Sequence, residues 1–61
     1  MIDVTRMNGT IVSINDDLIE SVEETPDTVI TLTTGKKVMV KESRQEIKEL
    51  VVAARREIHI L

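Results

Sequence analysis

Short runs of apolar residues among polar ones fill the first part of the chain. They occur at residues 2–6, 10–14, 28–33 and 37–41, and the first of them alternates apolar and polar residues. An alternation with a period of two is typical of a β-strand that buries one face. The run at 28–33 is also rich in β-branched residues, which pack well in sheets. We therefore predict a short strand at each of these places.

Two glycine turns connect the runs in pairs. Asn8 and Gly9 stand between the first pair, and both residue types tolerate the positive φ of tight hairpin turns. Thr34 and Gly35 stand between the second pair. Because Thr34 is β-branched and resists a positive φ, we predict a three-residue loop with Gly35 alone in the left-handed region. Each pair of runs should form an antiparallel hairpin.

The segment between the two hairpins is open to two interpretations. Residues 15–17 indicate a turn whose side chains bond the local backbone, and Pro26 marks a second turn over residues 25–28. Between them, residues 18–24 have apolar spacing that fits a helix, but the piece is short and ends next to a proline. We predict a strand with a bulge, with its acids facing water, and keep a helix as the alternative.

A capping box marks the start of a helix. Ser43 and Glu46 have the spacing at which a hydroxyl accepts the amide of the third helical residue and the carboxylate reaches back to the cap. Apolar residues then recur on one stripe with a period of 3.6, at Ile47, Leu50, Val51, Ala54, Ile58 and Leu61. We predict a helix to about residue 57, and the stripe leaves open whether residues 58–61 continue it.

Together these elements predict an α+β fold, with a small antiparallel sheet of about five short strands followed by one amphipathic C-terminal helix packed on it. The 61 residues make one domain, with the sheet in residues 1–42 and the helix and tail in residues 43–61. The chain has no cysteine and no aromatic residue, so the core must be aliphatic. Because so small a domain lacks the usual additional sources of stability, we expect a homo-oligomer.

Some apolar residues fall outside the faces that the core should use. Met39 is on the opposite face of its strand from the valines on either side, and Val52 lies off the helix stripe. In a small chain such residues suit a self-association surface. The candidate interaction surface comprises Lys36, Lys37, Met39, Val52 and Ile60, and the positions with structural roles are Asn8, Gly9, Pro26, Gly35, Ser43 and Glu46.

The charges are divided unevenly between the two parts of the chain. The net charge is −3, yet residues 1–34 carry seven acids and one base, whereas residues 35–61 carry seven bases and four acids. We expect this asymmetry to set an acidic edge of the sheet against a basic helix. The bases could also bind nucleic acid, but the chain is acidic overall and has no aromatic ring to stack on bases, so no nucleic-acid partner is expected.

No pattern of side chains indicates catalysis. His59 is the one histidine, and the sequence offers it no cysteine to activate and no fixed acidic partner. The acids near residue 16 lack the glycine that a calcium loop places at its sixth position. We therefore predict no enzyme, no cofactor and no metal. No apolar run is long enough to span a membrane and no leader-like segment opens the chain, so we expect no membrane insertion and a cytoplasmic location.

Three segments resemble a known family in order and spacing. Residues 1–9, 17–20 and 24–43 are similar to the FlbD family of small bacterial flagellar proteins, called SwrD in swarming bacilli. The blocks at 25–32 and 35–37 are the most specific. Family members often carry asparagine before the second hairpin glycine and an aromatic residue or two. In this chain Thr34 stands before that glycine and there is no aromatic residue. These two differences affect the type of turn and the packing of the core.

The resemblance implies a non-enzymatic cytoplasmic accessory protein that supports motility and swarming. The resemblance implies that the protein enables full power of the flagellar motor through contacts with motor or stator components. It does not imply a role in building the filament. No catalytic, cofactor or binding residue comes with the resemblance.

A second and shorter resemblance supplies the alternative. Residues 4–6 and 14–17 are similar to the opening of CsrA, a small dimeric RNA-binding translational regulator. Arg44 lies near the place where that family has basic RNA contacts. The middle of the chain fits FlbD far better. Binding of stem-loops that contain GGA would separate the two hypotheses.

Overall fold

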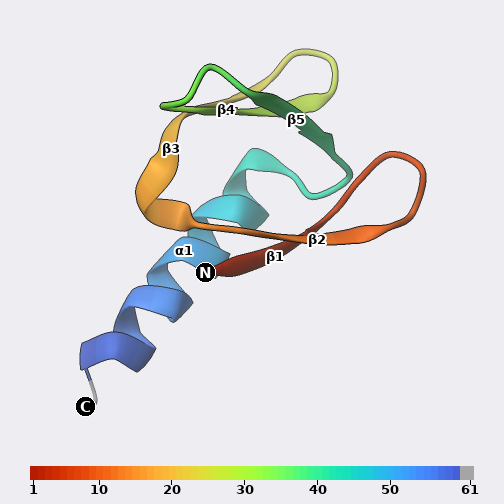
Figure 1. Ribbon diagram of the computed structural model, residues 1–61. Coiled ribbons are helices and arrows are strands. Elements are labelled where there is room, and N and C mark those ends of the chain that lie inside the picture. The colour runs from red at the N-terminus through yellow and green to blue at the C-terminus, as the bar shows by residue number, and fades with distance from the viewer. Residues whose placement is uncertain (60–61) are drawn as a thin grey trace.

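Strands and turns from the first two thirds of the chain and one helix from the last third form the predicted α+β fold (Figure 1). The computed structural model describes the backbone of residues 1–59 and the side chains of residues 1–56. In chain order the elements are β1 (Ile2–Thr5), β2 (Ile11–Ile14), the single 3-10 turn η1 (Asp16–Leu18), β3 (Ile19–Glu24), β4 (Thr28–Leu32), β5 (Lys37–Val40) and α1 (Arg44–His59).

The first hairpin joins β1 and β2 through a three-residue loop. The Arg6 N–H donates to the Thr10 carbonyl (2.8 Å), and the Gly9 N–H donates to the Arg6 carbonyl (2.9 Å). Gly9 has a φ of 91°. Asn8 tolerates a positive φ but does not adopt one, since within residues 1–59 only glycines do. Its side-chain oxygen instead accepts the Thr10 N–H (3.1 Å) and hydroxyl (2.7 Å).

The second hairpin joins β4 and β5 with the same loop geometry. The Leu32 N–H donates to the Lys36 carbonyl (2.8 Å), and the Gly35 N–H donates to the Leu32 carbonyl (2.9 Å). Gly35 has a φ of 92°, so the prediction of a three-residue loop with this glycine alone in the left-handed region is confirmed. The first hairpin has the same loop with Asn8 before its glycine, so the left-handed glycine is the feature that the two loops share.

Residues 19–24 form a strand, as predicted, and the helix alternative for this segment is wrong. β3 pairs antiparallel with β4, and its register shifts between Ile19 and Ser21, which is the expected bulge. The three glutamates of the strand, at positions 20, 23 and 24, are exposed. Leu18, which contributed to the helix-like spacing, belongs to η1.

The strands form two sheets rather than one continuous sheet. β1 and β2 make a two-stranded sheet, and the other three strands make a sheet in the order β3-β4-β5. The sheets meet at a single bridge between Arg6 and Val40, next to a hydrogen bond from the Lys41 N–H to the Thr5 carbonyl (2.8 Å). η1 turns the chain between β2 and β3, and the structure records no ladder between these two strands.

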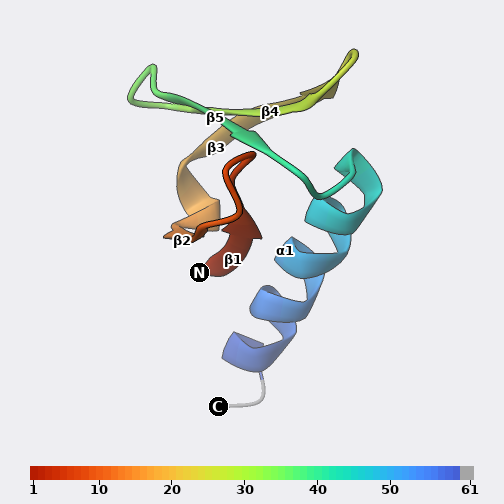
Figure 2. The same ribbon diagram turned by 90° about the vertical axis from the view of Figure 1, so that its right-hand side faces the viewer.

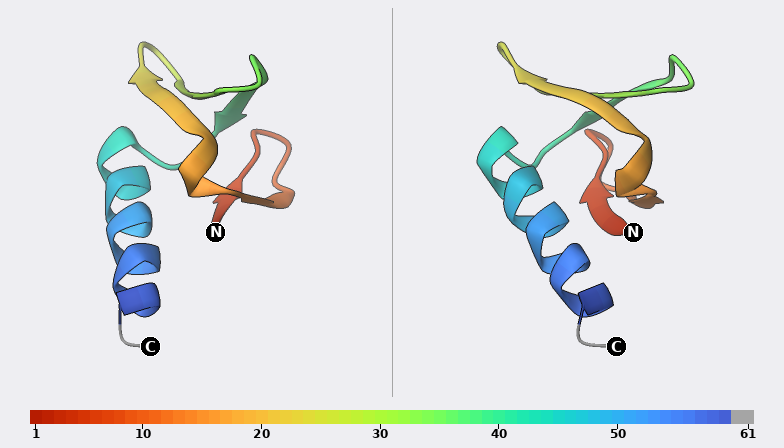
Figure 3. Two further views of the ribbon diagram at one scale, coloured as in Figure 1. Left: turned by 60° about the vertical axis from the view of Figure 1, so that its left-hand side comes forward. Right: turned by 90° about the vertical axis from the view of Figure 1, so that its left-hand side faces the viewer.

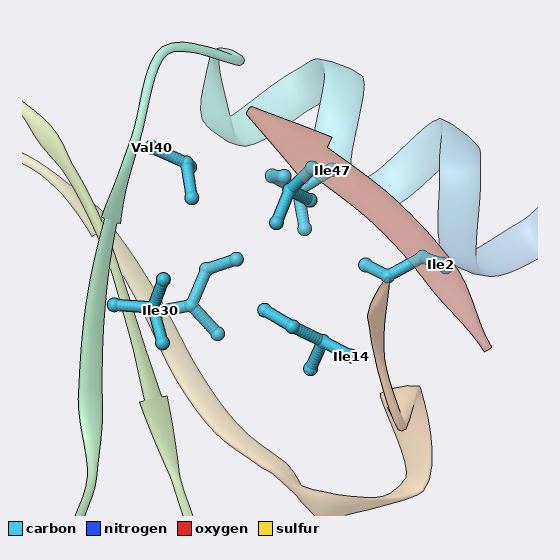
Figure 4. Packing of buried hydrophobic residues seen from close by; sticks show 7 residues of the cluster. Ile2, Ile14, Ile30, Val40 and Ile47 are labelled. Atoms are coloured by element: carbon cyan, nitrogen blue, oxygen red, sulfur yellow. The ribbon is translucent and has the colours of Figure 1, made fainter. Parts of the chain in front are cut away.

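The core lies where both sheets face the helix (Figure 4). It is entirely aliphatic, as the composition predicts, and its buried members are Ile2, Val4, Ile14, Ile30, Val38, Val40 and Ile47. Alternate residues of β1 and of β5 point into it, so the period-two pattern places these side chains correctly. Ile47 is the only one of these seven residues that α1 contributes, and it is 1% exposed.

α1 begins with the capping box that the sequence predicts. The Glu46 N–H donates to the Ser43 hydroxyl (3.1 Å), and the Ser43 N–H donates to the Glu46 carboxylate (3.1 Å). The helix packs against β1 and β3. Its later turns project beyond both sheets (Figures 1 and 2), and the stripe residues Leu50, Val51 and Ala54 are only half-buried. The side chain of Ile58 and all of Leu61 lie outside the described residues.

The sequence predicts a helix to about residue 57 and leaves residues 58–61 open. The helix continues to His59, so residues 58 and 59 are helical. Residues 60–61 lie outside the described backbone. In the part of the chain described, no helix combines the length and the apolar character needed to cross a membrane.

Candidate interaction site

The residues of the predicted interaction surface do not lie together. Lys36, Lys37 and Met39 line one shallow depression between the tips of the two hairpins, beside Met7. Met39 is 48% exposed and faces away from the core. Val52 is on α1, in a different hollow. Ile60 lies outside the described residues. The surface expected from the sequence therefore divides into at least two sites.

The second hollow is a groove of about 500 Å³ between α1 and β3. Its apolar lining comes from Ile19 and Val22 of β3 and from Ile47, Val51 and Val52 of α1. Ile19, Val22 and Val51 are half-buried, and Val52 is 43% exposed. Apolar side chains of two elements thus face one open space.

Three cations of α1 line the same groove. Arg44, Lys48 and Arg55 are spaced four and seven residues apart, which places them on one side of the helix. We call these three residues the basic row. Glu46 and Glu49 lie on the other side of the helix, next to Asp3 of β1. Cations of α1 thus line the groove beside β3, whereas Glu46 and Glu49 lie on the side toward β1.

Sequence reasoning missed this groove. The basic row was present as a periodic signal in the sequence, because a spacing of four and seven residues marks one face of a helix. Its opposite wall could not be predicted, since nothing local to Ile19 or Val22 indicates that β3 lies beside α1.

Asp16 fixes the end of the groove. Its side chain is only 5% exposed, and one carboxylate oxygen accepts a hydrogen bond from the α-amine of Met1 (2.6 Å). The other oxygen lies 3.8 Å from Nε of Arg55. The hydrogen bond from the α-amine lowers the pKa of the Asp16 carboxyl below its ordinary value, although burial acts in the opposite direction.

The sequence predicts only a turn at residues 15–17, and the turn is present. The side-chain oxygen of Asn15 accepts the Asp17 N–H (3.1 Å). The ion pairs of Asp16 were not foreseen, because both partners are distant in sequence.

Glu42 links the end of β5 to β1. Its carboxylate accepts the N–H and the hydroxyl of Thr5, each at 2.8 Å. Burial opposes ionisation of this carboxyl, but the two hydrogen bonds from Thr5 outweigh it and lower the pKa of Glu42. This contact lies beside the bridge between the two sheets and has a structural role.

The structure describes some of the residues that could take part in chemistry. Among residues 1–56, no three histidine, cysteine, aspartate or glutamate side chains gather closely enough to hold a metal ion. Ser43 is engaged as a helix cap. The side chain of His59 lies outside the described residues.

Comparison with protein families gives one match, and it spans nearly the whole chain. The model of the FlbD family, described as flagellar and swarming motility proteins, matches residues 1–59. No curated protein and no solved structure matches the chain.

Proposed function

Because the chain belongs to the FlbD family of flagellar and swarming motility proteins, we propose that it promotes the power of the flagellar motor by binding another protein. The partner is a component of the motor, with the stator or its regulators as the first candidates. The protein acts in the cytoplasm as an accessory factor and catalyses no reaction.

The family match carries this proposal, and the structure supports the part that concerns protein binding. FlbD is a family of motility proteins rather than a known enzyme family. The hollows described above are lined by apolar and charged side chains drawn from two elements each. Such a surface is suited to binding another chain.

The RNA-binding alternative has no support. The family match over residues 1–59 is to FlbD, and the chain has no aromatic residue on which a base could stack. Arg44, which the alternative places near an RNA contact, borders a groove that offers aliphatic side chains but no aromatic ring.

Deletion of the gene tests the function directly. We expect cells that keep a normal number of flagella but show reduced motor torque in a tethered-cell assay, with torque restored by the gene supplied in trans. A loss of filaments, or unchanged torque, would refute a role in motor power. A broad shift in translation of messages that contain GGA would instead favour RNA binding.

A further inference from the structure

β3 is an edge strand, and its free edge lies beside a helix. The three-stranded sheet has the order β3-β4-β5, so β3 pairs with β4 alone. Figure 3 shows α1 running alongside it. The Arg44 N–H donates to the Glu24 carboxylate (2.7 Å) at the end of β3, whereas Arg55 lies near Asp16, just before β3 begins. The helix therefore runs antiparallel to the strand.

The backbone of β3 has one unused side. In the described structure, the backbone groups of residues 20–24 form hydrogen bonds only with β4. A row of unpaired N–H and C=O groups at a sheet edge is a template for another strand. Several peptide-binding domains use this geometry, in which backbone hydrogen bonds give affinity and pockets for alternate side chains give specificity.

The side chains beside this edge indicate the chemistry of the added strand. On the face toward α1, the groove presents Ile19, Val22 and Val51, which would contact apolar side chains. Arg44 and Lys48 of the basic row border the same space and would pair with carboxylates, whereas Arg55 lies 3.8 Å from the carboxylate of Asp16. Of the strand's glutamates, Glu23 lies on the opposite face of the sheet from Val22, and Glu24 already accepts an N–H from α1.

A second copy of the chain is a poor occupant of this groove. Antiparallel pairing of two β3 strands would bring the glutamates at positions 20, 23 and 24 of both copies together, and like charges opposite one another destabilise a sheet. Pairing of two helices through their basic rows would likewise oppose like charges. Charge therefore favours a segment of a different protein whose carboxylates face the cations of the groove and not the exposed glutamates of β3, none of which lines the groove.

We propose that the groove between α1 and β3 binds an extended acidic segment of a partner protein, which adds to β3 as a fourth strand. Apolar side chains of that segment contact Ile19 and Val22, and its carboxylates face the basic row. This inference deepens the proposed function by naming the kind of segment that is bound. The inference rests on the proposed function only in placing the partner protein in the flagellar motor.

A display library of randomised nine-residue peptides, selected against the purified full chain, tests the proposal. We expect the selected peptides to carry aspartate or glutamate together with alternating apolar residues, and to lack proline at their centre. The tightest selected peptide should protect from hydrogen exchange those amides of residues 20–24 that point away from β4. N-methylation of the alternate peptide nitrogens that face β3 should abolish binding, because the added strand then loses its donors to β3.

Two charge reversals provide the matched comparison. Lys48→Glu should raise the Kd of that peptide about tenfold or more, since it turns an attractive contact into a repulsive one. Arg56→Glu makes the same kind of charge change on the same helix but does not line the groove, and it should leave the Kd within about twofold. Thermal unfolding of both variants shows whether each retains its fold.

Selection of basic peptides, of helical peptides or of no peptide at all would overturn the proposal. Equal weakening by the two reversals would overturn it as well. If the amides of β3 become protected at high protein concentration without any peptide, the groove belongs to a second copy. The peptide experiments use purified protein and test only the groove. The gene deletion tests only the role in motor power, so failure of one proposal can be told from failure of the other.

Discussion

Asp16 and Ser43 show how single polar residues hold elements together. Asp16 ties the start of β1 to the turn before β3 through its ion pair with the α-amine of Met1. Ser43 accepts a helical N–H that would otherwise lack an intrahelical partner. Each contact satisfies polar groups at the end of an element.

Removal of the cap should weaken the fold measurably. Ser43→Ala is expected to lower the free energy of unfolding by about 1 kcal/mol, the usual loss when an N-cap oxygen is removed. Ser43→Asn keeps a side-chain oxygen at the cap and should change stability by only a few tenths of a kcal/mol. Urea denaturation measures both, and an unchanged midpoint for Ser43→Ala would contradict the role of the cap.

Asp16→Asn should destabilise the protein in a pH-dependent way. The pKa of the Asp16 carboxyl is lowered in the folded state, so its contribution is fully present above the unfolded value of about 4. That contribution is lost as the pH falls through the folded pKa, because both states are then protonated. The difference in denaturation midpoint between wild type and variant should thus be present at pH 7 and shrink below about pH 4.

Asp17→Asn is the matched control for this substitution. Asp17 is the next residue in the chain and its side chain is exposed. A loss of stability as large as that of Asp16→Asn, or a difference at Asp16 that does not depend on pH, would contradict the ion pair.

At the scale of elements, the local signals predict most of the structure. The predicted runs become strands, Gly35 adopts the left-handed conformation expected of it, and the capping box starts α1. The bulge in β3 also follows from its broken alternation. These features depend on residues within one or two turns of each other, so the sequence contains the necessary information.

What the sequence could not predict depends on contacts between distant segments. The division into two sheets rests on the bridge between Arg6 and Val40, and the groove rests on the placement of α1 beside β3. Neither has a local signature, since the relative placement of elements is decided by how their apolar faces fit. The candidate interaction surface was therefore incomplete, with Val52 correctly exposed but its neighbours across the groove unidentified.

The two sides of α1 should respond differently to loss of methyl groups. Ile47 is buried, so Ile47→Val should cost about 1 kcal/mol of stability. Val52 is substantially exposed, so Val52→Ala should change stability by less than about 0.5 kcal/mol. Val52→Ala should nevertheless weaken binding of the selected peptide. If Val52→Ala costs as much stability as Ile47→Val, this part of the helix is more deeply packed than described.

At the scale of the whole molecule, we propose that the outer face of the three-stranded sheet mediates a homodimer. On this face Met39 lies beside Val29, with Glu23 on the β3 side and Lys37 on the β5 side. A two-fold axis parallel to β4 would set the β3 edge of one copy against the β5 edge of the other. Acidic and basic edges would then face each other around an apolar centre.

Light scattering tests this proposal. We expect a mass of twice 6.9 kDa at high concentration, and Met39→Glu should restore the monomer because it places a charge at the centre of the interface. Lys48→Glu, in the separate groove, should leave the dimer unchanged. A wild-type mass of 6.9 kDa at all concentrations would refute the homodimer.

The cations on the groove side of α1 would also affect how fast the proposed acidic segment arrives. The basic row faces the groove, and Glu46 and Glu49 lie on the other side of the helix. A field of this kind turns an approaching acidic segment toward the correct side before contact, which accelerates association. Salt shortens the range of that field, to about 10 Å at 0.1 M. Rising ionic strength should therefore slow association much more than it speeds dissociation, so capture of the partner would follow the salt content of the cell.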